Sequence, residues 1–421
     1  MQSRRRFLKS GFLAGAVALV GCKQREPSEK KAGPATAEPA KPADSTHPHE
    51  SPFSEPLMQE EFARRLASAQ KLLIQAKISG LFLTPSTNFY YLSGMRLHRS
   101  ERLTALLIPA RGEPVIVAPA FEAERVGRQG WLFNLKTWAE GEDSFQQMRE
   151  ALLSLKIASR AIGIEPTTDF ETLLNLRRVV PGASLVSAAA ILDRMRMIKS
   201  PRELEFMRKA VEGVTRAMDR VLPTLTSGLT ERQAARDIST EIRRLGGDGG
   251  GLVQFGSNTA VPHGEPTDRK LAPGDVVIFD IGMRIEGYTS DITRTCLYKE
   301  RNAEVEKIFD IVLRAQRAGQ AAASPGVTCE AVDDAARRVI QEAGYEQYFT
   351  HRLGHGLGLD GHEKPYLVHG NKTSLQPGMT ITMEPGIYIP GKFGVRIEDD
   401  FVIMEDGCKP LSTLETNLRL V

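Results

Sequence analysis

Residues 276–282 read Val-Val-Ile-Phe-Asp-Ile-Gly, an apolar run that a single carboxylate, Asp280, interrupts. A short continuous apolar run of this kind predicts a buried strand. Because burying an unpaired charge costs several kcal/mol, Asp280 needs a cationic partner. Eleven residues later, Asp291 places a second carboxylate in another predicted strand, in the stretch Thr-Ser-Asp-Ile-Thr-Arg-Thr at residues 289–295.

A reversal of the chain between these strands would bring the two carboxylates together. Residues 284–288 contain Gly287, which tolerates the backbone conformations of tight turns. We therefore predict a hairpin in which Asp280 and Asp291 lie side by side. The alternative is that one of these carboxylates pairs with Arg294 in the second strand.

Three segments further along the chain offer more ligand atoms. His355 lies in the Gly-rich sequence GHGLG, Glu384 in MEPG and Glu398 in VRIED. Four carboxylates and one imidazole suit Mn²⁺, Co²⁺ or Zn²⁺ better than a thiolate site would. Because carboxylates can bridge, five such side chains can hold two ions about 3.5–4 Å apart. Water between two such ions is acidic enough to act as a nucleophile at neutral pH.

Five of the eight histidines fall between residues 263 and 369. A lone histidine is usually structural, but His263, His351 and His362 cluster with the predicted ligands. Imidazoles beside a nucleophile can hold a carbonyl oxygen or pass a proton to a leaving nitrogen. His98 and His369 lie outside this pattern, and we assign them no function.

The pattern of helices and strands predicted over residues 58–421 indicates two folded domains. Residues 58–195 alternate between helix and strand, which is typical of an α/β domain. The expected helix is Gln59–Gln75, and the expected strands are Gly80–Pro85, Thr104–Pro109, Glu113–Ala118 and Ala161–Glu165.

Residues 196–421 form the second predicted domain. Ser200 with Glu203, and Thr230 with Gln233, predict the starts of two helices by the capping-box pattern. Two rounds of a helix pair followed by antiparallel strands predict an α+β domain of two similar halves, with a site in the cavity between them. The expected helices are 201–225, 230–245, 303–323 and 329–343, and strands are expected up to about 298 and about 404.

Residues 1–22 have the features of an export signal. Arg4, Arg5, Arg6 and Lys9 precede an apolar run at 11–21, which is shorter than the roughly 20 residues that span a bilayer. This pattern is typical of secretory signals, and the paired arginines resemble the twin-arginine type. Leu-Val-Gly-Cys at 19–22 also resembles a lipoprotein cleavage box.

We therefore expect export of the folded protein by the twin-arginine route and lipid attachment at Cys22 in the cell envelope. A plain signal peptide is the alternative. Residues 23–57 hold seven of the 24 prolines and no apolar periodicity, which predicts a tether. His47 and His49 lie in this tether, where solvent exposure is favoured over metal binding.

Composition and charge exclude several classes of protein. A chain that is 41% hydrophobic and 25% charged is neither wholly disordered nor a multi-span membrane protein. Loss of residues 1–21 would lower the formal charge from +3 to −1, so nucleic acid is not an expected partner. Four cysteines in 421 residues do not form a disulfide scaffold, and an odd number remains if Cys22 carries lipid.

Six motifs in order make the sequence resemble a known family. PHGEPTD, FDIG, YTSDITRT, GHGLGLDGHE, MEPG and VRIED are similar to those of the Xaa-Pro peptidase group of pita-bread metallopeptidases, which includes aminopeptidase P and prolidase. The resemblance covers about residues 58–410. Its first part, with NFYYLSG and ERLTALLIPARGEPVIV, resembles a creatinase-type N-terminal domain.

The resemblance implies a role for each ligand. Asp280 would bind one ion, Asp291 and Glu398 would bridge both ions, and His355 and Glu384 would bind the other. Manganese is the expected metal, with cobalt or zinc as alternatives.

The resemblance also implies roles around the metals. His263 and His362 would contact the substrate and stabilise the transition state, and His351 would line the pocket. Arg396 would orient a metal-bridging or a substrate carboxylate. The expected reaction is metal-dependent hydrolysis of the bond between a first residue and proline at the N-terminus of a peptide. We also expect a homo-oligomer, either a dimer or a tetramer.

Other functions are compatible with the same fold. A prolidase restricted to dipeptides differs from an aminopeptidase only in how the end of the pocket is closed. A metal-dependent lyase keeps most of the ligands. A non-catalytic binding module or a creatinase-like, metal-independent hydrolase would have lost ligands, and all five ligand positions are filled here. Cys296 and the export signal depart from the usual family pattern.

Overall fold

The computed structural model describes residues 59–129 and 133–421. The predicted signal and tether, with Cys22, His47 and His49, lie outside the described residues. Within the described part of the chain, no helix has both the length and the apolar character needed to cross a membrane.

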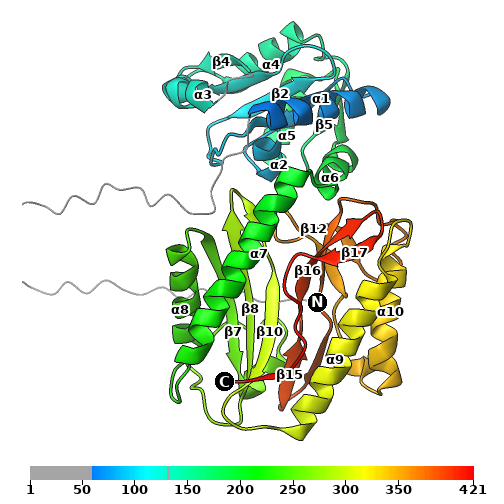
Figure 1. Ribbon diagram of the computed structural model, residues 1–421. Helices are drawn as coiled ribbons and strands as arrows, with labels where there is room; N and C mark the ends of the chain where they lie inside the picture. The colour runs from blue at the N-terminus through cyan, green and yellow to red at the C-terminus, as the bar shows by residue number, and fades with distance from the viewer. Residues whose placement is uncertain (1–58, 130–132) are drawn as a thin grey trace, which may run out of the picture. The chain divides into compact units, whose positions relative to one another are not determined.

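The N-terminal domain is built on one mixed sheet of six strands, in the order β4-β3-β2-β1-β5-β6 (Figure 1). β1 is antiparallel to β2 and parallel to β5, which places the predicted buried strands at the centre of the sheet. The strands are β1 Gly80–Leu83, β2 Ala105–Pro109, β3 Val115–Pro119, β4 Asn134–Trp138, β5 Ala161–Ile164 and β6 Ser184–Ser187. The helices are α1 Gln59–Gln75, α2 Thr87–Ser93, α3 Ala123–Gln129, α4 Ser144–Ser154, α5 Phe170–Val179 and α6 Ala189–Met197.

The predicted helix Gln59–Gln75 and all four predicted strands of this domain are confirmed within about two residues. The prediction missed the two edge strands, β4 and β6. Their residues are mostly exposed or half-buried, so they carry no apolar run.

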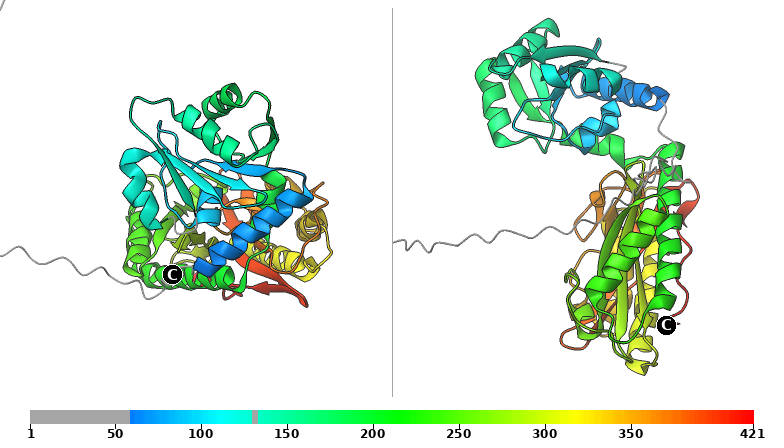
Figure 2. Two further views of the ribbon diagram at one scale, coloured as in Figure 1. Left: turned by 90° about the horizontal axis from the view of Figure 1, so that it is seen from above. Right: turned by 90° about the vertical axis from the view of Figure 1, so that its left-hand side faces the viewer.

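The second domain has the predicted two halves. In the first half, helices α7 Pro201–Val221 and α8 Glu231–Arg244 pack on a sheet of order β18-β10-β8-β7. In the second half, α9 Ala303–Ala322 and α10 Cys329–Glu342 pack on each other and beside a sheet of order β12-β11-β13-β16-β17 (Figures 1 and 2).

The strands of the second domain are mainly antiparallel. They are β7 Asp248–Phe255, β8 Val276–Ile285, β9 Tyr288–Thr289, β10 Ile292–Leu297, β11 Gly354–Gly356, β12 Glu363–Leu367, β13 Thr380–Met383, β14 Gly386–Ile389, β15 Phe393–Arg396, β16 Asp399–Met404, β17 Gly407–Pro410 and β18 Arg419–Leu420. β14 pairs with β15 in a separate two-stranded ribbon. The expectation that the strands are antiparallel and end at about residue 404 needs correction. β18 returns to the first half and pairs with β10 in parallel.

The local signals at the helix starts and at the hairpin act as predicted. Both capping boxes form, with Ser200 and Thr230 as the N-cap residues. Between β8 and β9, Glu286 has φ 49° and Gly287 has φ 91°. Two consecutive positive φ angles are the geometry of a two-residue hairpin turn that matches the twist of its strands. This turn starts the return of the chain from Asp280 toward Asp291.

The cysteines of the described residues form no disulfide. Cys296 and Cys329 are buried, and Cys408 is half-buried. Burial raises the pKa of the Cys296 thiol to about 12 and that of Cys329 to about 11, so both thiols stay protonated and pack as apolar groups.

Candidate metal centre

A cavity of about 500 Å³ lies between the two halves of the second domain. The five predicted ligands and the three predicted pocket histidines all line it, together with one arginine. The lining residues are His263, Asp280, Asp291, His351, Arg352, His355, His362, Glu384 and Glu398. Arg396 lies directly behind this surface and contacts Asp280.

The hairpin brings the first two carboxylates together. β8 and β10 pair antiparallel, with Thr293 opposite Asp280, and Asp291 immediately precedes β10. Carboxylate oxygens of Asp280, Asp291 and Glu398 lie within 4.8 Å of one another. The alternative pairing with Arg294 is wrong, because the guanidinium of Arg294 binds Asp399 at 2.6 Å.

His355 presents one ring nitrogen to the carboxylates. Its Nδ1 lies 3.0 Å from the carbonyl oxygen of Gly356, which can only accept a hydrogen bond. Nδ1 therefore carries the proton, and the lone pair of Nε2 faces the site. Nε2 lies 3.3 Å from Oε1 of Glu384 and 3.9 Å from Oδ2 of Asp291. Orientation by a backbone carbonyl is a common support of metal-binding histidines.

A threonine hydroxyl orients each of the two glutamates. Thr293 Oγ1 donates to Glu398 Oε2 at 2.7 Å. Thr382 Oγ1 donates to Glu384 Oε1 at 3.3 Å and accepts from the backbone N–H of His355 at 3.0 Å. Asp280 and His355 therefore lie in strands, the other three ligands directly flank strands, and hydrogen bonds to the two glutamates and His355 hold their orientation.

Among the described residues, cations of the protein balance only part of the negative charge of the cluster. Burial and the neighbouring Asp280 raise the pKa of Asp291 well above its usual range, and burial and Asp291 do the same to the pKa of Glu398. Arg396 is the cation beside them, and it faces Asp280. Four carboxylates around one arginine are the donor set that divalent cations neutralise, so the residues fit the implied metals.

Arg396 is part of a hydrogen-bonded chain behind the ligands. Its Nη2 forms an ion pair with Asp280, and its Nη1 donates to the hydroxyl of Tyr388 at 2.8 Å. Nε of Arg396 donates to Thr293 Oγ1 at 3.2 Å. Its carboxylate partner is thus Asp280, for which the resemblance implies contact with one ion rather than a bridge.

Tyr388 continues this chain to His351. His351 Nδ1 donates to the carbonyl of Arg352 at 2.8 Å, so its Nε2 accepts from the Tyr388 hydroxyl at 2.9 Å. Burial lowers the pKa of His351 and raises that of Tyr388 to about 12, so both are neutral at pH 7. The sequence analysis missed Tyr388, although it follows MEPG closely in the buried strand β14.

His362 and Arg352 stand at the open side of the cavity. The ring of His362 lies 4.0 Å from that of His355, and its Nδ1 is 3.5 Å from Nη2 of Arg352. Partial burial, and then the neighbouring His355 and Arg352, lower the pKa of His362. The Arg352 guanidinium stacks on the ring of Tyr366 at 4.4 Å. In the part of the chain that the structure describes, no carboxylate forms an ion pair with Arg352.

A two-half α+β domain with a carboxylate-rich metal centre between its halves defines a metallopeptidase of the pita-bread fold. Comparison with known families agrees with this class. Residues 205–405 match the family model of metallopeptidase family M24, and residues 65–198 match that of the creatinase/prolidase N-terminal domain.

Individual relatives resemble almost the whole folded part. The "Probable dipeptidase PepE" of Mycobacterium tuberculosis is 39% identical over 86% of this chain and 97% of its own length. Dipeptidase PepE from Mycobacterium ulcerans matches with a TM-score of 0.82 and 37% identity, over 87% of this chain and 100% of that one. A prolidase from Thermococcus sibiricus matches with a TM-score of 0.80 and 33% identity, over 86% and 99%. The chain belongs to metallopeptidase family M24.

Proposed function

We propose that this metallopeptidase hydrolyses the bond between a first residue and proline, with two divalent ions held by the five ligands. The observation that carries the proposal is the cluster of Asp280, Asp291, Glu384 and Glu398, half-buried or buried, around the buried His355. The likeness to a prolidase supports the choice of proline. An Xaa-Pro bond has no N–H to offer an ordinary extended-strand binding site, so it needs a specialised pocket.

The residues around the ligands divide the remaining work. When bound, the ions would polarise the peptide carbonyl and supply a water acidic enough to attack it. We assign proton transfer to the leaving ring nitrogen to His362, the imidazole next to His355. His263, from the opposite half, would hold the carbonyl oxygen. Arg396 holds Asp280 in place by an ion pair. The hydroxyl of Tyr388 orients Arg396 and His351 through a hydrogen bond with each.

Arg352 supports dipeptides as the preferred substrates. An extended chain advances at most about 3.6 Å per residue, so the carboxylate of a dipeptide lies one short step from the bond that is cut. Arg352 contacts His362, whose ring lies beside that of His355. Among the described residues, no carboxylate pairs with Arg352. In a longer peptide this position holds a neutral amide. We therefore favour a dipeptidase over an aminopeptidase that acts on long chains.

Three substrates test this assignment. Ala-Pro, Ala-Pro-amide and Ala-Pro-Ala are offered to the protein loaded with Mn²⁺, Co²⁺ or Zn²⁺. A hydrogen bond to a charged group contributes about 1.5–3 kcal/mol, so kcat/KM for Ala-Pro should exceed that for the amide about 10- to 100-fold. Cleavage of none of the three by the metal-loaded protein would favour a lyase or a binding protein.

Matched variants separate the role of Arg352 from a general charge effect. Arg352→Gln should abolish the preference for the free carboxylate. Lys372→Gln removes an exposed cation that pairs with Glu330 outside the cavity, and it should leave the preference unchanged. Equal rates for Ala-Pro and Ala-Pro-Ala in the unaltered protein would instead favour the aminopeptidase.

We also propose export by the twin-arginine route and a lipid anchor at Cys22. The basis is the sequence of residues 1–22 alone. Cell fractionation of the full chain and of Cys22→Ser tests it, since only the unaltered chain should partition into detergent. Release of both forms in soluble form would exclude the anchor.

Manganese as the native metal and a dimer or tetramer as the assembled state are proposals as well. The donor set of carboxylates with one imidazole supports manganese, although cobalt and zinc tolerate the same ligands. Metal analysis of the exported protein and light scattering test these two points separately.

A further inference from the structure

Among the described residues, few contacts of its own side chain hold His362. The imidazole is exposed, and the hydrogen bond that it makes is a long one of 3.5 Å to Arg352. It lies in the connection between β11 and β12, a segment with no regular structure. A loop that places an imidazole within reach of the metal ligands needs anchors, and two carboxylates flank His362 at residues 360 and 363.

We infer that Arg196 and Lys199 are positioning residues for His362, acting through Asp360 and Glu363. These four residues are called the ion-pair cluster below. The inference rests on the proposed function, because it concerns the group assigned to proton transfer.

The cations of the ion-pair cluster and Thr87 together contact every oxygen of the two flanking carboxylates. Lys199 Nζ lies 2.6 Å from Glu363 Oε1, and Arg196 Nη2 pairs with Glu363 Oε2. The same Nη2 lies 2.7 Å from Asp360 Oδ2, and Thr87 Oγ1 donates to Asp360 Oδ1 at 2.7 Å. The side chains of Lys199 and Glu363 are only 1% and 9% exposed. Ion pairs screened so little by water have strict geometry.

The cations of the ion-pair cluster come from a distant part of the chain. Arg196 lies in the last turn of α6, where its Nη1 also donates to Asn88 Oδ1 at 3.2 Å. Lys199 lies in the connection from α6 to α7, and its backbone N–H donates to the carbonyl of Gly378 at 2.9 Å. The last helix of the N-terminal domain and the connection that follows it therefore supply contacts to the loop of His362 in the catalytic domain.

Gly358 provides a separate observation in favour of the inference. A Cβ at this position would lie 2.9 Å from Lys199 Cε and 2.9 Å from Glu363 Oε1. Its φ is not in the left-handed region, so the backbone does not require glycine there. The third glycine of GHGLG thus leaves room for the Lys199–Glu363 pair, and the three atoms nearest to an alanine Cβ there would all belong to that pair.

Two variants perturb the ion-pair cluster, and one serves as a matched control. Glu363→Gln keeps the shape of the side chain but removes its charge, and Gly358→Ala pushes the pair apart. Lys364 pairs with Asp193 of α6 at 2.7 Å, one residue beyond Glu363, but this pair is largely exposed. Lys364→Met therefore breaks a surface contact between the same two segments and is the control.

A double-mutant comparison tests the inference in the metal-loaded protein. For Xaa-Pro dipeptides, Glu363→Gln and Gly358→Ala should lower kcat at least tenfold, with KM and metal content unchanged, and Lys364→Met should change kcat less than twofold. In a His362→Ala background, the same two changes should cost less than a further twofold. Equal losses in both backgrounds would overturn the inference, because they would show a general structural role.

Crystal structures of the metal-loaded Gly358→Ala variant give a readout that does not depend on activity. We expect the ring of His362 to move away from that of His355, while the five ligands stay in place. An unmoved His362 would overturn the inference. Failure of the unaltered protein to cleave any Xaa-Pro peptide would instead refute the proposed function and leave this structural outcome to decide the positioning role.

Discussion

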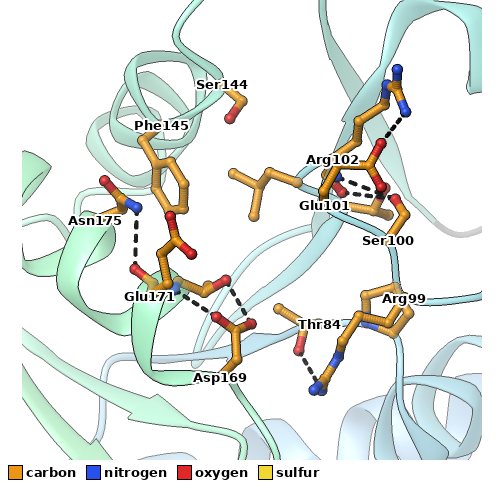
Figure 3. Close-up of a pocket in the computed structure, with 14 residues that line it drawn as sticks. Thr84, Arg99, Ser100, Glu101, Arg102, Ser144, Phe145, Asp169, Glu171 and Asn175 are labelled. Carbon is orange, nitrogen blue, oxygen red and sulfur yellow. Dashed lines mark hydrogen bonds and ion pairs between the residues drawn. The ribbon is translucent and has the colours of Figure 1, made fainter. Parts of the chain in front are cut away.

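The metal cavity and a pocket in the N-terminal domain are similar in volume but opposite in charge balance. The second pocket has about 450 Å³ and is lined largely by polar residues (Figure 3). There, Arg102 pairs with Glu140, and the carboxylate of Asp169 accepts hydrogen bonds from the amide and hydroxyl of Thr172. In the metal cavity, the carboxylates face one another instead. Uncompensated buried charge, rather than volume, distinguishes a site from a surface hollow.

The largest expected effect comes from removing a carboxylate of the metal cavity. Asp291→Ala should abolish turnover and metal binding with little loss of folded structure, because the side chain serves ions rather than packing. Turnover, metal content and circular dichroism of the purified variant check this. Unchanged turnover in a variant without metal would contradict the assignment of the metal cavity as the active site.

Removing the metal should destabilise the protein more at high pH than at low pH. Burial and neighbouring carboxylates raise the pKa of Asp291 and Glu398 in the metal-free fold. The folded state then binds protons that the unfolded state releases above about pH 4, so metal-free stability falls as pH rises toward the raised pKa values. Bound ions replace these protons.

The metal-dependent rise in Tm should therefore be larger at pH 8 than at pH 5.5. At a free metal concentration of 100 Kd, binding adds about 2.7 kcal/mol to the free energy of unfolding. Thermal unfolding with and without Mn²⁺ at both pH values measures the difference. An equal rise at both pH values would argue against carboxylate ligands.

A smaller effect is expected at the chain of hydrogen bonds behind the ligands. Tyr388→Phe leaves a buried N–H of Arg396 and Nε2 of His351 without a partner. We expect a loss of about 1–3 kcal/mol in the free energy of unfolding. We also expect kcat/KM to fall about tenfold, because Asp280 loses part of its support.

Tyr366→Phe is the control, since it keeps the ring that stacks on Arg352. Denaturant unfolding and steady-state kinetics compare the two variants. Equal losses of stability and of kcat/KM in the two variants would show that the Tyr388 hydroxyl does not support the metal ligands.

The smallest effect belongs to the pocket of Figure 3. Asp169 is the N-cap of α5, so Asp169→Ala should cost about 1 kcal/mol of stability. The variant should keep its kcat/KM and its metal content. A loss of turnover without a loss of metal would show that this second pocket takes part in function.

The sequence predicts those features whose cause is local. The apolar run around Asp280 and the turn at Gly287 are enough to predict the hairpin, and capping boxes locate the starts of α7 and α8. The edge strands β4 and β6 were not predicted, because they carry no apolar run.

Features that depend on contacts between distant residues could not be predicted. Lys199 and Glu363 are 164 residues apart, and nothing near either residue indicates the other. Tyr388 looks like an ordinary strand residue until the fold places Arg396 and His351 on its hydroxyl. The ligand motifs were recognisable because each combines a chemical group with a local backbone signal.

The most direct test of the central claim is anomalous diffraction from crystals grown with Mn²⁺. The account predicts two manganese peaks between the two halves of the catalytic domain, within bonding distance of the five predicted ligands, and none in the pocket of Figure 3. Crystals that contain excess Mn²⁺ but show no peak among these carboxylates, with their side chains turned apart, would contradict it.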